Sequence, residues 1–267
     1  MTSPWYEVGD RVWVRRYEAL DQTIGAIGSA SGLAVIDTRA THRDADELRR
    51  DLGHLPGSVT AVINTHGHWD HAFGNARFVP TRIWGHVRCA AMVRDRGDEM
   101  RARMIAESTA EDAEAFAEVE LTPPTELFEE SAVVDLGDRE VELRHLGPAH
   151  TDNDIVISVR DAAVLFVGDL LENAAAPAFG DSYPIGWAGV GRALLGLVDG
   201  PVVPGHGDPF DIHFAERQVG ELELLASLAR DAVSGAIGLD DAVGRSPFAA
   251  EVTGQAIDRA RVELSAE

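Results

Sequence analysis

Short apolar runs separated by turn residues recur along most of the chain. Runs of roughly four to eight residues bounded by Gly, Pro, Asn or Asp are typical of β-strands. This pattern predicts strands at 12–15, 23–28, 33–37, 59–64, 133–136, 141–146, 154–159, 163–167 and 202–203. The stretch Gly-Ser-Ala-Ser-Gly at 28–32 supplies a turn between the second and third of these strands.

Other segments are rich in good helix formers or carry apolar residues at helical spacing. They predict helices at 43–52, 98–120, 189–198, 214–233 and 251–264. The segment 98–120 mixes Ala and Met with alternating charges, which favours a solvated helical surface. Because strands and helices are mixed from the outset, we expect an α/β fold.

No low-complexity linker or short repeat divides the chain, so we predict a single domain over residues 1–267 with a helical carboxyl-terminal segment at about 214–267. The stretch 174–187 contains two Pro and several Gly and Ala residues, which indicates a surface loop.

Composition narrows the functional classes. The chain has 267 residues, 45% of them hydrophobic, which is enough to bury a full core. Its formal charge is -22, and all 23 basic residues are Arg. Because nucleic-acid binding relies on clustered basic charge, we expect no nucleic-acid partner and favour a small-molecule substrate.

The amino terminus lacks a basic segment followed by an apolar one, and no run approaches the roughly 18 apolar residues of a membrane span. We therefore expect a cytoplasmic protein that does not associate with membranes. Cys89 is the only cysteine, which excludes an internal disulfide. The sequence leaves the oligomeric state open.

Four predicted strands lead into residues that can bind a metal ion. The candidates are His66, His68, Asp70 and His71 in the stretch NTHGHWDH, His150 in GPAH, Asp169 in VGD and His206 in PGH. Ligands of layered α/β proteins gather at the carboxyl ends of strands, so these distant residues can form one site.

Imidazole and carboxylate groups suit zinc, manganese or iron. Seven donors are too many for one tetrahedral ion, but they suit two ions about 3.5–4 Å apart, bridged by a carboxylate and a water-derived hydroxide. In an extended segment His66 and His68 point to the same side, and Gly67 between them lets the backbone pass close to the metal.

These motifs resemble those of the metallo-β-lactamase superfamily, whose signature is HxHxDH followed by separate His, Asp and His ligands. The resemblance covers about residues 12–207 and implies a four-layer αββα sandwich with the site at one edge of the sheets. It also implies a ligand set for each of two metal ions: His66, His68 and His150 for the first, Asp70, His71 and His206 for the second, and Asp169 as the bridge.

Differences between this sequence and the motifs of individual branches narrow the choice of branch within the superfamily. True β-lactamases place Cys or Ser where Asp169 stands, and flavodiiron proteins typically place Glu where His68 stands. The carboxyl-terminal region has no Lys and only scattered Arg, which weakens the resemblance to glyoxalase II, and the acidic composition weakens that to the nuclease branch. Quorum-signal lactonases match in size and ligand set, with Tyr183 as the candidate for their catalytic tyrosine.

The resemblance and the donor set favour a hydrolase with two divalent ions, most simply Zn²⁺, with Mn²⁺ or Fe²⁺ as alternatives. The expected reaction is hydrolysis of an ester, thioester, lactone or amide by a hydroxide held between the ions. Asp70 is the candidate catalytic residue, because it can orient the hydroxide or pass its proton to the leaving group.

Weaker interpretations concern the surroundings of the site. Asp37 either orients a histidine ligand or caps its strand. Trp69, Tyr183 and Trp187 either wall an apolar substrate pocket or belong to the core. Five arginines either bind an anionic substrate or form a solvated helical face with interleaved acids, which is the simpler interpretation: Arg88, Arg94, Arg96, Arg101 and Arg103.

Two other functions stay open. A mononuclear iron dioxygenase acting on persulfides would hold its iron through His66, His150 and Asp169. A non-catalytic metal-binding protein is the second, although that class is expected to lack a ligand and none is missing here. Metal identity and stoichiometry distinguish the enzymes.

Overall fold

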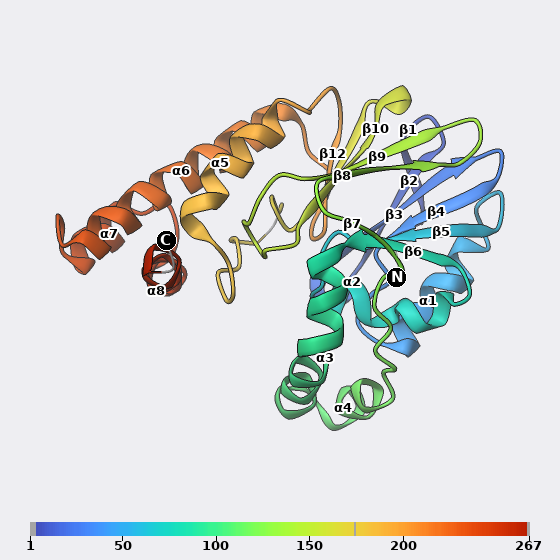
Figure 1. Ribbon diagram of the computed structural model, residues 1–267, viewed down its shortest axis with the longest axis horizontal. Helices are drawn as coiled ribbons and strands as arrows, with labels where there is room; N and C mark the ends of the chain where they lie inside the picture. Colours follow the sequence, from blue (N-terminus) through green and yellow to red (C-terminus); the bar gives the residue numbers. More distant parts are fainter. Residues whose placement is uncertain (1–3, 174, 266–267) are drawn as a thin grey trace.

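The computed structural model describes residues 4–173 and 175–265. Two β-sheets pack against each other and helices cover their outer faces (Figure 1). The predicted four-layer αββα arrangement is therefore confirmed.

The first sheet has seven strands, which neighbour one another in chain order. They are β1 (Tyr6–Gly9), β2 (Val12–Tyr17), β3 (Gln22–Ser29), β4 (Gly32–Ile36), β5 (Val59–Ile63), β6 (Arg82–His86) and β7 (Glu126–Phe128). Pairing is antiparallel from β1 to β4 and parallel from β4 to β7. The carboxyl ends of β4 and β5 consequently lie at one edge, where Asp37 and the segment from Asn64 to His71 follow them.

The second sheet has five strands in the order β12-β11-β10-β9-β8. They are β8 (Ser131–Asp135), β9 (Glu140–His145), β10 (Ile155–Val159), β11 (Val164–Gly168) and β12 (Val202–Pro204). Only β11 and β12 pair in parallel, so Asp169 and His206, which follow them closely, reach the same edge. His150 lies in the connection between β9 and β10.

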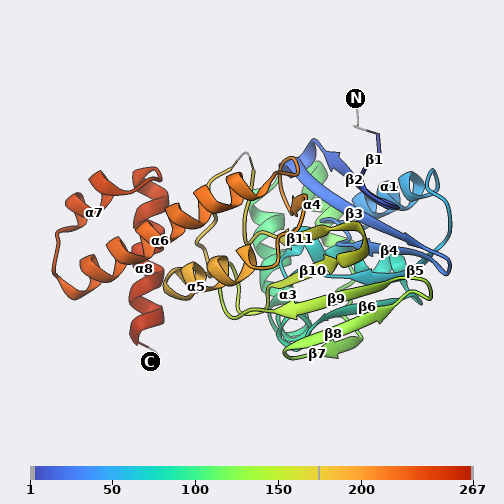
Figure 2. The same cartoon turned by 90° about the horizontal axis from the view of Figure 1, so that it is seen from above.

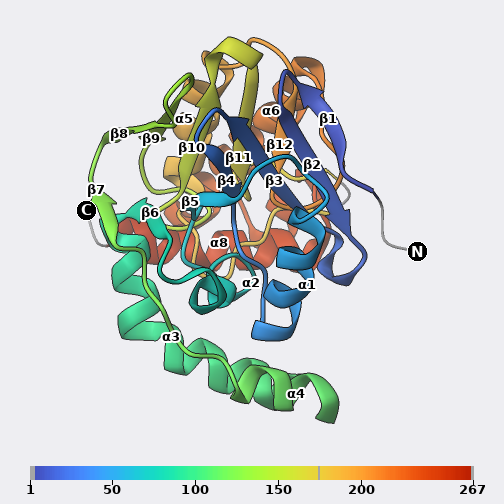
Figure 3. The same cartoon turned by 90° about the vertical axis from the view of Figure 1, so that its right-hand side faces the viewer.

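Helices lie on both sides of the sandwich. Those of the first half are α1 (His42–Leu52), α2 (Trp69–Ala72), α3 (Val87–Glu107) and α4 (Ala110–Ala117), and those of the second half are α5 (Pro184–Leu195), α6 (Ile212–Ser234), α7 (Leu239–Arg245) and α8 (Ala250–Ser265). Short 3₁₀ helices occur at Ala19–Asp21, Phe73–Phe78 and Arg160–Ala162. In Figure 3, α3 and α4 project away from the sheets.

Apolar side chains form the layers of the core. Ile36, Ile157 and Phe166 belong to the cluster between the sheets. Leu48 of α1 packs on the outer face of the first sheet, and Leu222 of α6 packs on the outer face of the second. Burial of these faces is the main driving force that holds the layers together.

Helices α5 and α6 extend from the outer face of the second sheet beyond the end of the sandwich, where α7 and α8 pack with them (Figure 2). Their shared cluster includes Leu228, Ala242 and Ile257, each almost fully buried. The predicted helical segment at about 214–267 corresponds to α6, α7 and α8 within the described residues. That the whole chain folds as one domain stays a prediction.

Several element boundaries differ from those predicted. The helix placed at 98–120 begins at Val87 and is interrupted after Glu107, because Thr109 adopts an extended conformation and its hydroxyl caps α4. The loop prediction for 174–187 is wrong from Pro184 onward, where α5 begins, and residue 174 lies outside the described residues. Strands β1 and β7 and helix α7 are too short for a periodic pattern to predict.

None of the helices in the described ranges combines the length and the apolar content needed to cross a membrane.

Candidate metal centre

The carboxyl ends of the central strands bring all seven predicted ligands to one edge of the sandwich. His66 and His68 lie between β5 and α2, and α2 itself carries Asp70 and His71. Their donor atoms form three groups in which every atom lies within 4.8 Å of the others. The groups are His66, His68 and His150; His66, His71 and Asp169; and Asp70, His71 and His206.

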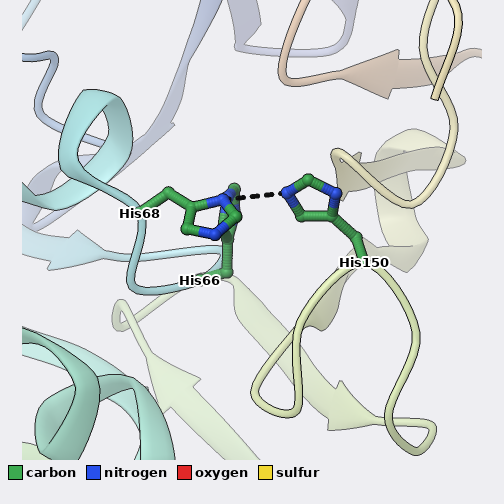
Figure 4. Close-up of side chains that lie close together, drawn as sticks. All are labelled: His66, His68 and His150. Carbon is green, nitrogen blue, oxygen red and sulfur yellow. Dashed lines mark hydrogen bonds between the residues drawn. The ribbon is translucent and has the colours of Figure 1, made fainter. Parts of the chain in front are cut away.

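Three imidazoles converge in the first cluster (Figure 4). His68 Nδ1 lies 3.1 Å from His66 Nε2 and 2.9 Å from His150 Nε2. Two nitrogens bound tetrahedrally to zinc at about 2.0–2.1 Å are roughly 3.3 Å apart. The distances between the ring nitrogens are therefore close to those between two ligands of one zinc ion.

The second cluster joins Asp70, His71 and His206. His206 Nε2 lies 3.2 Å from His71 Nε2 and 3.2 Å from Asp70 Oδ2, and Asp70 Oδ2 is 3.5 Å from His71 Nε2. Two nitrogens and one carboxylate oxygen thus face a common point, which is a donor set that divalent zinc, manganese or iron accepts.

Asp169 lies between the clusters. Its Oδ2 atom is 3.8 Å from His66 Nε2 and 3.6 Å from His150 Nε2 in the first cluster. The same atom is 3.4 Å from His71 Nε2 and 3.5 Å from His206 Nε2 in the second. Its other oxygen, Oδ1, is buried and has no hydrogen-bond partner within the described part of the chain. A buried carboxylate oxygen left in this way is costly unless a cation neutralises it, so the residues fit divalent metal binding.

Gly205 makes room for this carboxylate. A Cβ atom at position 205 would lie 2.1 Å from Asp169 Oδ1 and 2.8 Å from His71 Cε1. The residue between β12 and His206 must therefore have no side chain.

The packing of its own loop also requires a glycine at position 67. A Cβ atom there would meet Met92 Sδ at 3.0 Å and the carbonyl oxygen of Cys89 at 3.2 Å. The glycine thus allows the loop to pack closely on α3, and its amide donates to Asn153 Oδ1 at 2.9 Å, which ties the loop to the turn that carries His150.

Hydrogen bonds at the remote ring nitrogens orient the histidines. Asp37 Oδ2 lies 2.8 Å from His71 Nδ1 and also accepts from the Thr65 hydroxyl at 2.7 Å. That hydroxyl is 3.0 Å from His66 Nδ1, so one network supports both rings. The predicted position of Asp37 beside a candidate ligand is therefore present, and such contacts fix the ring tautomer.

The other rings use different partners. His206 Nδ1 is 2.8 Å from the carbonyl oxygen of Leu20, and His68 Nε2 is 3.1 Å from Asp181 Oδ1. His150 Nδ1 is buried and unpartnered within the described residues, and the indole of Trp187 packs edge-on against this ring at 5.6 Å.

The histidines of the first cluster differ in their protonation. Burial opposes protonation of His68, but its bond to Asp181 outweighs burial and raises the pKa of this ring. Burial and the neighbouring His71 hold the pKa of His66 well below its usual value, and burial with His68 lowers the pKa of His150 to about 4. These rings are neutral near pH 7 and offer lone pairs.

In the second cluster, burial opposes protonation of His206, but Asp169 and Asp70 outweigh it and raise its pKa to about 11. Burial likewise opposes ionisation of Asp169, yet His71 and His206 keep the pKa of its carboxyl well below its usual value. Protons thus hold the positions that a cation takes when it binds, and binding must release them.

The clusters open into a cavity of about 470 Å³ between α3 and the 175–181 segment. Trp69 and Met100 supply apolar wall, and small residues of that segment line the other side: Ala175, Ala176, Ala178 and Gly180. The prediction for Trp69 as a wall of the pocket agrees with this placement.

The other two predicted substrate residues lie elsewhere. Trp187 is fully buried in α5 and donates through Nε1 to the carbonyl oxygen of Leu170, so it supports His150 instead of lining the cavity. Tyr183 lines a neighbouring cavity of about 330 Å³ that shares Arg96 and Asp181 with the first. Neither side chain borders the cavity that contains the candidate ligands.

Two cavity residues escape the sequence analysis. Asp181 and Glu172 were not predicted, whereas Arg96 and Arg103 are exposed, as the solvated-face interpretation expects, and also border the cavity. Glu172 is buried, and burial together with Asp169 raises its pKa to about 8. Its position three residues after Asp169 is the only signal that the sequence offers for it.

Comparisons with known proteins bear on this geometry. A family model described as the metallo-beta-lactamase superfamily matches residues 18–206, which include all seven candidate ligands. Among curated proteins, the chain is similar to acyl-coenzyme A thioesterase MBLAC2 of Gallus gallus, with 27% identity over 62% of this chain and 60% of that protein. The Homo sapiens protein of the same name is 26% identical over 77% of this chain and 76% of its own length.

Solved structures show the same fold. The inverting sec-alkylsulfatase Pisa1 from Pseudomonas sp. superposes with a TM-score of 0.74 and 17% identity, over 96% of this chain and 49% of the sulfatase. The DIM-1 metallo-beta-lactamase gives a TM-score of 0.63 and 13% identity, over 84% of this chain and 99% of that enzyme. The chain thus spans about half of the sulfatase and less than two thirds of the chicken thioesterase.

Proposed function

Because this chain belongs to the metallo-beta-lactamase superfamily, we propose that it is a metal-dependent hydrolase that cleaves an ester, thioester, lactone or amide bond of a small molecule. We further propose that it uses two divalent metal ions, most simply Zn²⁺. The observation that carries the proposal is the position of Asp169, whose Oδ2 atom lies 3.4–3.8 Å from histidines of both clusters.

In this proposal His66, His68 and His150 hold the first ion, and Asp70, His71 and His206 hold the second. Asp169 would be within reach of both ions. When bound, such a pair of ions lowers the pKa of a water molecule toward neutrality and polarises the carbonyl that is attacked.

Asp70 is the residue that we assign to proton transfer. Its carboxyl group borders the cavity, where the substrate would lie. Burial opposes its ionisation, but His71 and His206 keep its pKa well below the usual value. The carboxylate is therefore ionised near neutral pH and can accept a hydrogen bond that orients a water molecule; a role in proton transfer requires its pKa to rise when the substrate is bound.

Thioesters are the bond type to test first, since the two curated relatives described above are named acyl-coenzyme A thioesterases. The cavity supports a substrate with an apolar part, because Trp69 and Met100 border it beside the candidate ligands.

The first experiment is the metal content of protein purified without added metal, measured by inductively coupled plasma mass spectrometry. About two zinc or manganese ions per chain, with turnover of acetyl-coenzyme A or a para-nitrophenyl ester, is the expected result. About one iron per chain, with oxygen consumption on a persulfide, would replace the hydrolase with a mononuclear iron dioxygenase.

Two further outcomes refine the test. Tight metal binding without turnover of any ester, thioester, lactone or amide would favour a non-catalytic metal-binding protein. Asp70→Ala should lower kcat by at least about a hundredfold, the lower limit for general acid–base catalysis, and full turnover in that variant would remove Asp70 from the mechanism.

A further inference from the structure

One face of α3 borders the cavity with Arg96, Met100 and Arg103. We propose that this face binds an anionic group, a carboxylate or a phosphate, at the non-reacting end of the substrate. The inference rests on the proposed hydrolase function and narrows its substrate class.

Helical spacing places these side chains together. Residues 96, 100 and 103 follow the spacing i, i+4, i+7, which puts them on one side of a helix. All three line the same cavity as five of the candidate ligands, which are His68, Asp70, His150, Asp169 and His206. With a rise of about 1.5 Å per residue, Arg96 and Arg103 are about 10 Å apart along the axis.

Arg96 marks the end of this face that is nearest to the metal centre. Its Nη1 atom is 3.2 Å from Asp181 Oδ2, and the other oxygen of Asp181 is 3.1 Å from His68 Nε2. The charge of Arg96 is thus matched by a carboxylate that also orients a candidate ligand.

Arg103 has no such counterpart. Within residues 4–173 and 175–265, its exposed guanidinium group forms no hydrogen bond or ion pair. A shortage of acids is not the reason, because the chain has 45 Asp and Glu against 23 Arg. The cavity therefore presents an arginine that is available to a ligand.

The charge of the whole molecule strengthens the argument. A formal charge of -22 repels anions at long range, so an anionic substrate requires positive charge inside the pocket. A guanidinium group binds carboxylate or phosphate through two parallel hydrogen bonds. Between the two arginines, Met100 offers an apolar surface to the chain that links the anion to the reacting bond.

The anion can belong to either side of the scissile bond. It is a carboxylate if the acyl group is that of a dicarboxylic acid, and a phosphate if the leaving group is coenzyme A. Matched substrate pairs distinguish these sources: para-nitrophenyl hydrogen adipate against para-nitrophenyl hexanoate, and acetyl-coenzyme A against S-acetylpantetheine.

Arg103→Gln is the decisive variant, because the wild-type side chain makes no polar contact with the described residues that its loss would disturb. We expect this variant to raise KM for the anionic member of one pair about tenfold, because a tenfold change corresponds to the free energy of about one charged hydrogen bond. KM for the neutral member should stay unchanged. Arg103→Lys should restore part of the effect.

Arg94→Gln is the matched control. Arg94 lies on the same helix, pairs with the adjacent Asp95 and does not border the cavity, so this variant makes the same change in net charge. Equal effects of Arg94→Gln and Arg103→Gln, or no effect of Arg103→Gln on either pair, would overturn the proposal.

A binding measurement tests the inference without turnover. Isothermal titration calorimetry compares adipic acid monoanilide with N-phenylhexanamide on the purified protein. The wild type should bind the acid about tenfold more tightly, and Arg103→Gln should abolish that preference. The same comparison of coenzyme A with pantetheine tests the phosphate source. If no substrate is hydrolysed, the proposed function fails while these preferences still decide the inference; equal affinities of the wild type within both pairs would refute it.

Discussion

Asp37 carries more contacts to the metal centre than its place at the end of a strand suggests. It is almost fully buried, accepts from the amide of Thr65 at 2.8 Å and from the hydroxyl of that residue, and contacts His71 Nδ1. Its φ of 64° lies in the left-handed region, which a non-glycine residue occupies only when its surroundings hold it there. The strain is consistent with a positioning role.

Replacing Asp37 by Asn should weaken metal binding at the second cluster about 10- to 100-fold, because the amide is a poorer acceptor for His71 Nδ1–H. Competition with a chelator, followed by metal analysis, measures this change. Asp258→Asn on the exposed surface of α8 is the control and should bind metal like the wild type. Unchanged affinity in Asp37→Asn would reduce Asp37 to a structural cap.

Glu172 provides a pH-dependent test at the same scale. Its backbone amide and carbonyl both bond to the side chain of Gln218, at 2.9 and 2.8 Å, so the residue is fixed beside the cavity. Burial and then Asp169 raise its pKa to about 8 from 4.5. Because the folded state holds the proton more tightly, the associated stability is fully present below about pH 4.5 and is lost as the pH rises through about 8.

Glu172→Gln should remove this loss. In metal-depleted protein, the free energy of unfolding of the variant relative to the wild type should rise between pH 5 and 8.5, by at most about 5 kcal/mol. Urea unfolding at a series of pH values measures it, with Glu221→Gln on the exposed side of α6 as control. Parallel pH profiles for the wild type and Glu172→Gln would contradict the buried, protonated carboxyl.

Local sequence signals were sufficient for some site residues and not for others. Residues such as His66 and His206 were predicted because each lies within a few residues of the end of an apolar strand. Asp181 lies in a segment without periodicity, and only the folded loop brings it to His68. For Trp187 the sequence left two roles open, and the structure supports the core role, because α5 begins at Pro184 and buries the indole.

At the scale of elements, the junction between β12 and His206 has no room for a side chain. Gly205→Ala should displace Asp169 or His71 and destabilise the fold by about 1–3 kcal/mol, the usual cost of overpacking. The variant should also lose metal on dialysis. Metal analysis and thermal unfolding measure the two effects separately.

Gly254→Ala in α8 is the matched control, because a Cβ atom there meets nothing within 4 Å. It should keep its metal and gain up to about 1 kcal/mol from helix propensity. A Gly205→Ala protein with full metal content would show that the centre adapts to the added methyl group.

Whether the sequence predicts a helix or strand depends on what stabilises that element. The central strands are buried apolar runs, so their patterns reveal them, as β10 and β11 show. Strands β1 and β7 lie at the two edges of the first sheet and form through pairing with one neighbour, which no local pattern encodes. The break between α3 and α4 depends on a single cap at Thr109.

At the scale of the whole molecule, the carboxyl-terminal helices reach back to the site. Arg259 of α8 donates to the carbonyl oxygens of Ser182 and Asp181, at 3.0 and 3.3 Å. Glu263 of the same helix accepts from the amides of residues 185 and 186 at 2.8 Å each, and so caps the start of α5. Helix α8 lies outside the range that the family model matches, yet it fixes the segment that presents Asp181 to His68.

Arg259→Gln should therefore loosen the 175–183 segment without removing the candidate ligands. Loss of the charged hydrogen bonds, worth about 1.5–3 kcal/mol each, should speed amide exchange in this segment by roughly tenfold or more. Hydrogen–deuterium exchange with mass spectrometry measures it peptide by peptide. Arg261→Gln is the control, because Arg261 pairs with the exposed Asp258 on the same helix. Equal exchange in both variants would mean that α8 only packs beside the site. Faster exchange in Arg259→Gln alone, together with a raised KM, would show that the carboxyl-terminal helices shape the substrate pocket from outside the sandwich.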